Sequence, residues 1–421
     1  MKSAVPACAS FLLLLTSPVW AEAPSEETAE VRRQVQQLTE LVEQLQGTVQ
    51  AQQERIAQLE RGQMPAAAAM GAAAASTVAK PRQAVSSLSA FNPEIGVLAD
   101  VVGRLSESSA DGDGNDKLSA REVELVFGHP IDPYSRLDVT ATFSDFEAAD
   151  LEEAYITHWG LPGEIKARLG RLRPKIGKAS PLHRDSLDTV DEPLVVSSYL
   201  GGEGLSRTGL ELSGFLPVPW TDVTHELTVG MMEGGVGEGG TLFGSTRRRP
   251  SLYTHLKNFW DITDTSNLEL GATYLTGSKD EDASFEVHAL GLDATAIHYV
   301  TPTNKLKWQN EAYLQHRDES VTEDISVSKT PWGFYSLLDA RLSPRFGVGG
   351  RFDYVEPVGI DPARLARDAD TAWSGYLTFY QSEFARWRLQ LRHTNFASGG
   401  DDNTIFAQGT VAIGVHKHQL Q

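Results

Sequence analysis

The stretch Glu-Val-Glu-Leu-Val-Phe at residues 122–127 alternates acidic and apolar side chains before its last two residues. Successive side chains of a β-strand point to opposite faces, so Glu122 and Glu124 share one face, and Val123 and Leu125 share the other. A strand with one apolar and one charged face is typical of a membrane barrel, where lipid contacts one side and a polar lumen the other.

The same two-residue period recurs from Phe91 to the end of the chain. Clear cases are residues 95–101, 137–143, 227–231, 268–274, 306–308, 346–352, 387–391 and 411–415. About sixteen such segments are present, and bacterial barrels have an even number of strands. The pattern therefore predicts an all-β transmembrane antiparallel barrel over residues 91–421.

Connection length supports this interpretation. Short turns are expected around Pro130, Gly160, Pro217, Asp264, Pro302, Pro344 and Ser382. Longer connections alternate with them, at residues 107–117, 174–204, 233–249, 317–329 and 356–370. Short periplasmic turns and long external loops are the rule in outer-membrane barrels. An exported soluble β-protein, the alternative, has no reason to keep this alternation.

The composition limits the partners. The 421 residues carry a net charge of −19 and are 41% hydrophobic, with a mean hydropathy of −0.27. The sequence has no run of about 18 apolar residues, which a membrane-spanning helix requires. The mean hydropathy does not exclude a barrel, because strands that alternate apolar and polar residues have an ordinary mean hydropathy even when one face contacts lipid. The acidity argues against a nucleic-acid partner. The expected partner is outer-membrane lipid.

The N-terminus resembles an export signal over residues 1–21, with an alternative cleavage site after residue 23. Lys2 supplies the positive start, and an apolar core begins at Phe11. The only cysteine, Cys8, lies in this segment, so the mature chain is expected to have neither a disulfide nor a catalytic thiol.

Residues 24–63 are predicted to form a periplasmic coiled coil. Branched and Leu residues recur every seven positions over residues 31–59, as coiled-coil seams require. The seam leaves dimers and trimers both open, and the alternative is a helix that folds back onto its own domain. Residues 64–90 are rich in Ala, Ser and Pro and are expected to be a tether.

Seven cations and no acid occupy residues 166–184 of this otherwise acidic chain. The segment follows the fifth predicted strand, and its long loop is expected to fold into the lumen and narrow it. The expected anion-attracting residues are Lys166, Arg168, Arg171, Arg173, Lys175, Lys178 and Arg184, with Arg388 and Arg392 on a later strand. Opposing acids are Glu122, Glu124, Glu153, Asp185 and Asp188, with Asp191 and Glu192 beside them. The alternative is that the cations only pair with lumenal acids to hold the wall.

A calcium-like spacing of oxygen ligands occurs at Asp111, Asp113, Asn115 and Glu122. Asp116 stands where such loops have glycine, so a solvated acidic loop is the preferred interpretation. The eleven histidines show no helical metal-binding pair, and no nucleophile elbow, phosphate loop or dinucleotide fingerprint is present. No bound metal, cofactor or enzymatic activity is predicted.

Short motifs throughout the region from Phe91 onward resemble a family of porin-like outer-membrane proteins related to phosphate-selective porins. They lie at residues 91–95, 132–134, 151–155, 163–171, 191–194, 200–204 and 382–384. The resemblance implies a homotrimer of sixteen-stranded barrels with basic lumens. The chain departs from such barrels in ending Gln-Leu-Gln rather than on an aromatic residue.

The resulting hypothesis is an outer-membrane porin for passive diffusion of small anionic solutes. One alternative is a structural anchor, in which the coiled coil links the barrel to the periplasm or cell wall. Another is a porin associated with metal uptake. Conductance separates a pore from an anchor.

Overall fold

The computed structural model describes residues 93–107, 117–145, 149–202, 204–218, 222–233, 249–278, 285–322, 325–359 and 367–414. The predicted signal peptide, coiled coil and tether lie outside these residues. So do Asp111, Asp113 and Asn115 of the calcium-like spacing, and the C-terminal residues 415–421.

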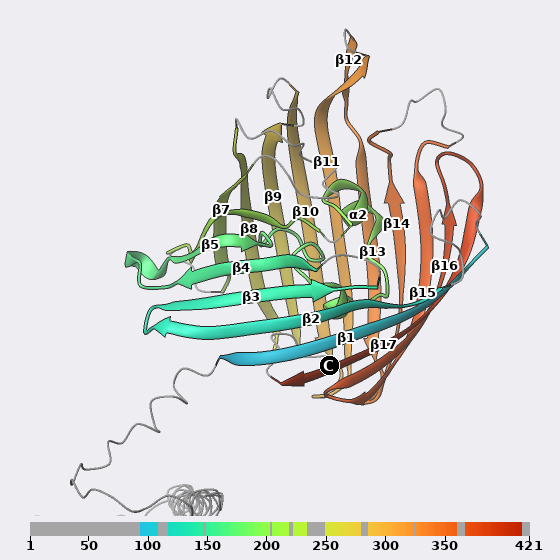
Figure 1. Ribbon diagram of the computed structural model, residues 1–421, viewed down its shortest axis with the longest axis horizontal. Helices are drawn as coiled ribbons and strands as arrows, with labels where there is room; N and C mark the ends of the chain where they lie inside the picture. The colour runs from blue at the N-terminus through green and yellow to red at the C-terminus, as the bar shows by residue number, and fades with distance from the viewer. Residues whose placement is uncertain are drawn as a thin grey trace, which may run out of the picture. The chain divides into compact units, whose positions relative to one another are not determined.

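Within the described residues, a single antiparallel sheet runs through every strand (Figure 1). The strands are β1 (Glu94–Ser106), β2 (Lys117–Asp132), β3 (Ser135–Phe143), β4 (Asp150–His158), β5 (Lys166–Leu172), β6 (Arg207–Phe215), β7 (Thr224–Met232), β8 (Ser251–Thr263), β9 (Ser266–Ser278), β10 (Glu286–Tyr299), β11 (Lys305–Thr322), β12 (Ile325–Lys329), β13 (Trp332–Arg341), β14 (Phe346–Val355), β15 (Asp370–Ser382), β16 (Ala385–Asn395) and β17 (Asp401–Gly414). Apart from β12 and β13, which both pair with β11, each strand pairs with its neighbours in sequence, as in a meander.

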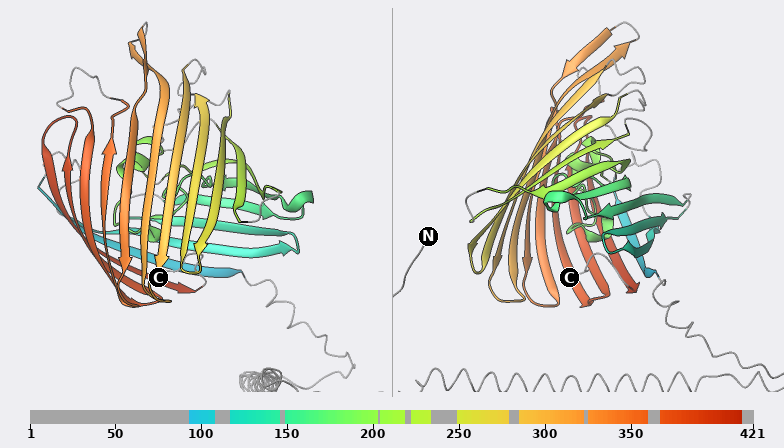
Figure 2. Two further views of the ribbon diagram at one scale, coloured as in Figure 1. Left: turned by 180° about the vertical axis from the view of Figure 1, so that it is seen from behind. Right: turned by 90° about the vertical axis from the view of Figure 1, so that its left-hand side faces the viewer.

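The sheet closes on itself because β1 also pairs with β17, from Gly96 opposite Gly414 to Ser106 opposite Thr404. Both β12 and β13 pair with β11: β12 pairs with residues 317–322 of β11, and β13 pairs with residues 305–314. These two successive strands therefore form one interrupted strand of the wall, and 17 named strands make 16 positions around the barrel. Figure 2 shows this wall from behind and from the side. The predicted closed antiparallel barrel of sixteen strands is confirmed.

The two faces of the wall differ as the sequence period requires. On β16, Trp387, Leu389 and Leu391 are half exposed on the outer face, whereas Arg388 and Gln390 are buried in the interior. Outward apolar side chains suit contact with lipid, and inward polar side chains form a polar lumen.

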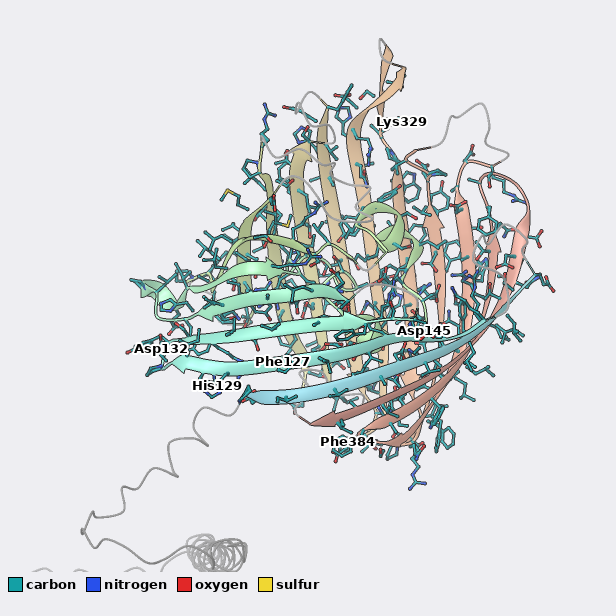
Figure 3. The ribbon with its side chains drawn as sticks, viewed as in Figure 1. Phe127, His129, Asp132, Asp145, Lys329 and Phe384 are labelled. Carbon is teal, nitrogen blue, oxygen red and sulfur yellow. The ribbon has the colours of Figure 1, made fainter. Side chains whose placement is uncertain are left out.

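Turns and long connections alternate only in part. The prediction of a long loop at residues 317–329 is wrong, because residues 317–322 belong to β11 and residues 325–329 to β12, and the two pair as a hairpin. The β3–β4 and β16–β17 connections, residues 144–149 and 396–400, are also no longer than the longest turns at the other end. Figure 3 shows Phe384, in the β15–β16 turn, and Lys329, at the end of β12, at opposite ends of the barrel. The turn expected at Pro130 forms instead at residues 133–134. Pro130 remains in β2 beside a register shift, where its missing N–H is tolerated, and Asp132 Oδ1 accepts the Tyr134 N–H at 2.7 Å to close the turn.

Two register shifts place additional charged residues in the interior. Asp100 pairs with Glu122 and Val101 with Ala120, so Arg121 is an extra residue in β2. Glu152 is similarly extra in β4, because Thr140 pairs with Glu153 and Ala141 with Leu151. A β-bulge re-aims side chains in this way.

The described helical segments are short. They are the 3-10 helices η2 (Pro162–Glu164) and η3 (Arg184–Ser186) and the α-helix α2 (Leu194–Tyr199). None of the helices in the described part of the chain is long and apolar enough to cross a membrane.

Candidate functional site in the barrel interior

The described residues of the connection between β5 and β6, 173–202 and 204–206, lie inside the barrel and are called the lumenal loop. Its Val190 N–H donates to Gln390 Oε1 of β16 at 2.7 Å, and its Val190 carbonyl accepts a hydrogen bond from Arg121 of β2. Its helix α2 packs against β13 and β14 on another part of the wall (Figure 1). The loop therefore contacts widely separated strands, which only a position in the lumen allows.

Arg351 of β14 is the most extensively bonded anchor of the lumenal loop. Its side chain is fully buried and lies 2.9 Å from Asp191 Oδ2 and 2.7 Å from Asp353 Oδ2. It also donates to the backbone carbonyls of Asp191 and Glu192 at 2.8 and 3.1 Å. A planar guanidinium with five donors suits such a junction of carboxylates and carbonyls.

An apolar cluster secures the other part of the loop. Ile176, Val195 and Tyr199 are fully buried, and they belong to one cluster with inward side chains of the wall, including Tyr313 and Tyr335. Removal of this apolar surface from water favours the docked loop. The lumen is thus both charged and, on one side, apolar.

The loop turns at Gly177, where only glycine fits. Its φ is +61°, and a Cβ there would lie 1.8 Å from Glu311 Oε1. The close approach lets the Ala179 N–H donate to Glu311 Oε2 at 3.1 Å. Tyr313 donates to the same carboxylate at 2.7 Å, so Glu311 is a polar anchor for the loop.

Five of the predicted anion-attracting cations form ion pairs, four of them at 3.2 Å or less and Arg171 at 3.7 Å. The closer pairs are Arg168 with Glu211 at 2.7 Å, Arg173 with Glu152 at 2.8 Å, Lys178 with Asp293 at 3.2 Å and also with Glu269, and Arg392 with Asp191 at 2.8 Å. At these positions the geometry agrees with the alternative drawn from the sequence, in which the cations pair with acids of the interior and hold the wall.

Three other predicted cations form no ion pair with a carboxylate of the described residues: Lys166, Lys175 and Arg388. Arg388 is buried and donates to the Leu187 carbonyl of the loop at 2.9 Å. Burial, together with the charges of Lys166 and Arg168, lowers the pKa of Lys175 to about 8. Lys166 and Lys175 are within electrostatic reach of Glu226, and Arg388 is within reach of Asp188 and Asp339, so these cations have acids nearby without a direct ion pair.

The remaining two predicted cations, Arg171 and Arg184, lie in other surroundings. Arg171 occupies the face of β5 opposite to Arg168, donates to the Glu152 carbonyl at 3.3 Å and lies 3.7 Å from Asp150. Arg184 donates to the Gly202 carbonyl at 3.3 Å in an exposed part of the loop.

Of the loop acids that were expected to oppose the predicted cations, Asp191 forms an ion pair with one of them, Arg392. These acids also contact Lys307, Arg351 and Arg386, which are wall cations that were not predicted. Asp188 pairs with Lys307, and Asp191 pairs with Arg351 and Arg392. Burial disfavours ionisation of both acids, but these cations hold the pKa of Asp188 and of Asp191 below its ordinary value. Asp185 is buried, and its carbonyl accepts from Arg386.

A group of acids surrounds His183 where the loop meets β2 and β4. The His183 ring lies 2.8 Å from Glu152 Oε2 and 3.1 Å from Glu153 Oε2. Burial alone would lower the pKa of His183, but hydrogen bonds to these two carboxylates and the nearby charge of Glu124 raise it to about 10. Glu122 and Glu124 are also buried, and each has a carboxylate oxygen within 4.8 Å of a nitrogen of this ring.

Several residues of the interior were not predicted from the sequence. Arg121 and Glu152 depend on bulges, which a strict period of two assigns to the wrong face. Arg351 and Arg386 alternate with outward apolar residues on β14 and β16, and that alternation was available as a signal.

No family model matches the chain. A protein of Aquifex aeolicus (strain VF5), described only as uncharacterized, is 28% identical over 337 residues, which is 72% of this chain and 71% of that protein.

Solved structures show the fold more clearly. The outer membrane channel DcaP of Acinetobacter baumannii has a TM-score of 0.53 at 11% identity, over 76% of this chain and 96% of that one. OprB of Pseudomonas putida has a TM-score of 0.52 at 11% identity, over 76% and 94%. OmpF of Salmonella typhi has a TM-score of 0.52 at 8% identity, over 76% and 98%. The chain thus has the fold of outer-membrane porins.

Proposed function

We propose that this protein is an outer-membrane porin through which small anionic solutes diffuse passively, and that it acts as a channel and not as an enzyme. The observation that carries the proposal is the lumenal loop, which is held inside a closed barrel of porin fold beside charged wall residues. Rings and clusters of fixed charge at such a constriction select permeating ions. A membrane anchor would need no such interior.

Preference for anions is proposed from the cations that have no carboxylate partner among the described residues. Lys166 and Lys175 lie next to each other, and Arg388 is buried where the loop crosses β16. A fixed charge attracts an ion 4 Å away by about 1 kcal/mol in bulk water and by severalfold more near protein. This local attraction opposes the repulsion of anions by the net negative charge of the chain.

Single-channel recording in planar bilayers tests the pore, and reversal potential in a salt gradient tests its selectivity. We expect discrete conductance steps and preferential anion permeation from the purified protein. Lys166→Gln with Lys175→Gln should lower the anion-to-cation permeability ratio about fivefold, because about 1 kcal/mol corresponds to that factor. The matched control Arg249→Gln changes a half-exposed cation, which salt screens. Absence of conductance would favour the anchor, and an unchanged ratio would remove the anion preference.

We further propose that the chain assembles as a homotrimer through residues 31–59, as the heptads and the resemblance to phosphate-selective porins suggest. Mass measurement in mild detergent should give three chains for the full protein and fewer after deletion of that segment. A monomeric full-length protein would refute this assembly.

A further inference from the structure

The strongest unexplained feature of the interior is a pair of buried carboxylates on β2. Glu122 and Glu124 are 3% and 2% exposed, and Glu122 Oε1 and Glu124 Oε2 have no hydrogen-bond partner. Buried polar atoms in folded proteins are almost always bonded to protein, water or an ion. Two neighbouring carboxylates removed from water also repel each other.

The charges around His183 do not balance. Arg173 and His183 are in contact with Glu152 and Glu153, so two cations match two acids. Glu122 and Glu124 form no ion pair among the described residues, and a charge of −2 is left over when both are ionised. Arg184 and Asp185 are also within electrostatic reach of this group, but their opposite charges offset each other.

Ligand atoms of Glu122, Glu124 and His183 lie within 4.8 Å of one another. Bonds of about 2.1 Å to a common ion require ligand atoms about 3.5 Å apart, so side-chain movements of about 1 Å would complete the site. On β3, Thr142 pairs with Glu124 of β2 and Thr140 pairs with Glu153 of β4, so small side chains separate the acids of these two strands.

From these observations we propose that Glu122, Glu124 and His183 bind one divalent transition-metal cation. One imidazole nitrogen and two carboxylates suit such an ion better than Ca²⁺, which takes six to eight oxygen ligands. The ion binds one nitrogen of His183, which releases its proton there. The ion adds a charge of +2, and the proton lost from His183 removes +1, so binding lowers the charge imbalance of this group from −2 to −1.

Glu152 and Glu153 have the positioning role in this site. A histidine that binds a metal commonly donates its other ring N–H to a carboxylate, which fixes the orientation of the ring. Both acids already contact the His183 ring, so one of them keeps its bond when the other nitrogen turns to the metal. The bound ion connects the lumenal loop to β2.

The test is equilibrium dialysis of the tag-free, detergent-folded full chain against Zn²⁺ alone, with bound metal counted by mass spectrometry. We expect one Zn²⁺ per chain, little competition from equal Ca²⁺, and at least tenfold weaker binding in Glu122→Gln with Glu124→Gln and in His183→Gln. The matched control His255→Gln changes another buried histidine of the interior, close to Asp293, and should leave binding unchanged. Heat-modifiable migration on gels verifies that each variant is folded.

Wild-type protein that binds no Zn²⁺, or a folded double Glu→Gln variant that binds it as wild type does, would overturn the proposal. X-ray absorption of the Zn²⁺-loaded wild-type protein decides the matter even if the variants do not fold, because the site requires imidazole scattering. The readouts do not involve conductance. Failure of the metal site and failure of the porin function are therefore distinguishable.

Discussion

Substitution of Arg351 by Met should release the lumenal loop without opening the barrel. Arg351 is fully buried, and its removal leaves the buried Asp353 without its 2.7 Å partner and weakens the contacts of Asp191. Removal of one member of a buried ion pair costs about 3–5 kcal/mol. Since about 1.4 kcal/mol is tenfold, the population of released loops should rise by about 150- to 4,000-fold.

Chymotrypsin measures this release at Tyr199, which is fully buried and donates to the Glu356 carbonyl at 2.9 Å in the docked loop. Cleavage after Tyr199 follows the released population when docking is fast relative to cleavage. We expect cleavage of detergent-folded Arg351→Met to be at least a hundredfold faster, with heat-modifiable migration retained. Arg249→Met, which removes an exposed ion pair, is the control and should match wild type. Equal cleavage rates in wild type and Arg351→Met would refute this account of the anchor.

Three further predictions follow from the interior and the outer loops. Burial and the charge of Lys166 lower the pKa of Lys175 to about 8, so its positive charge is present below pH 8 and lost above it. The anion preference, measured by reversal potential, should therefore fall between pH 7 and 9. An anion preference that does not change over this range would contradict the role of Lys175. Gly177→Ala should raise Tyr199 cleavage severalfold, because its Cβ displaces Glu311; wild-type cleavage would show that the turn adapts. Protease added to whole cells should cut within residues 234–248, whereas cutting only at the β13–β14 turn would invert the proposed topology.

The barrel was predictable because its signal is local. The outward position of Leu389 and Leu391 follows from the two-residue period of a single extended strand. Many turns between the strands can also be recognised from the local sequence. The bulges at Arg121 and Glu152 were not predictable in this way, since one inserted residue reverses the assignment of faces and leaves no compositional mark.

The candidate site was predictable in outline but not in its pairings. The concentration of cations at residues 166–184 indicated that the long connection after the fifth strand folds into the lumen, and the structure places the described part of that connection there. Whether a given cation faces an acid depends on strands far away in sequence, so Lys178 meets Asp293 while Lys175 meets another lysine. The approach of His183 to Glu122 likewise depends on how the loop folds across the barrel.

Val190 connects the two sides of the seam at which the barrel closes. Its N–H is bonded to Gln390 of β16 and its carbonyl to Arg121 of β2, and these strands flank the β17–β1 junction. Filling of the lumen and closure of the ring are thus linked equilibria: each bond made by the loop across the seam favours the closed ring, and closure in turn favours the docked loop. A barrel assembling in the membrane with an incorrectly placed loop would therefore have a weaker seam, and lateral opening toward lipid would begin at β1 and β17.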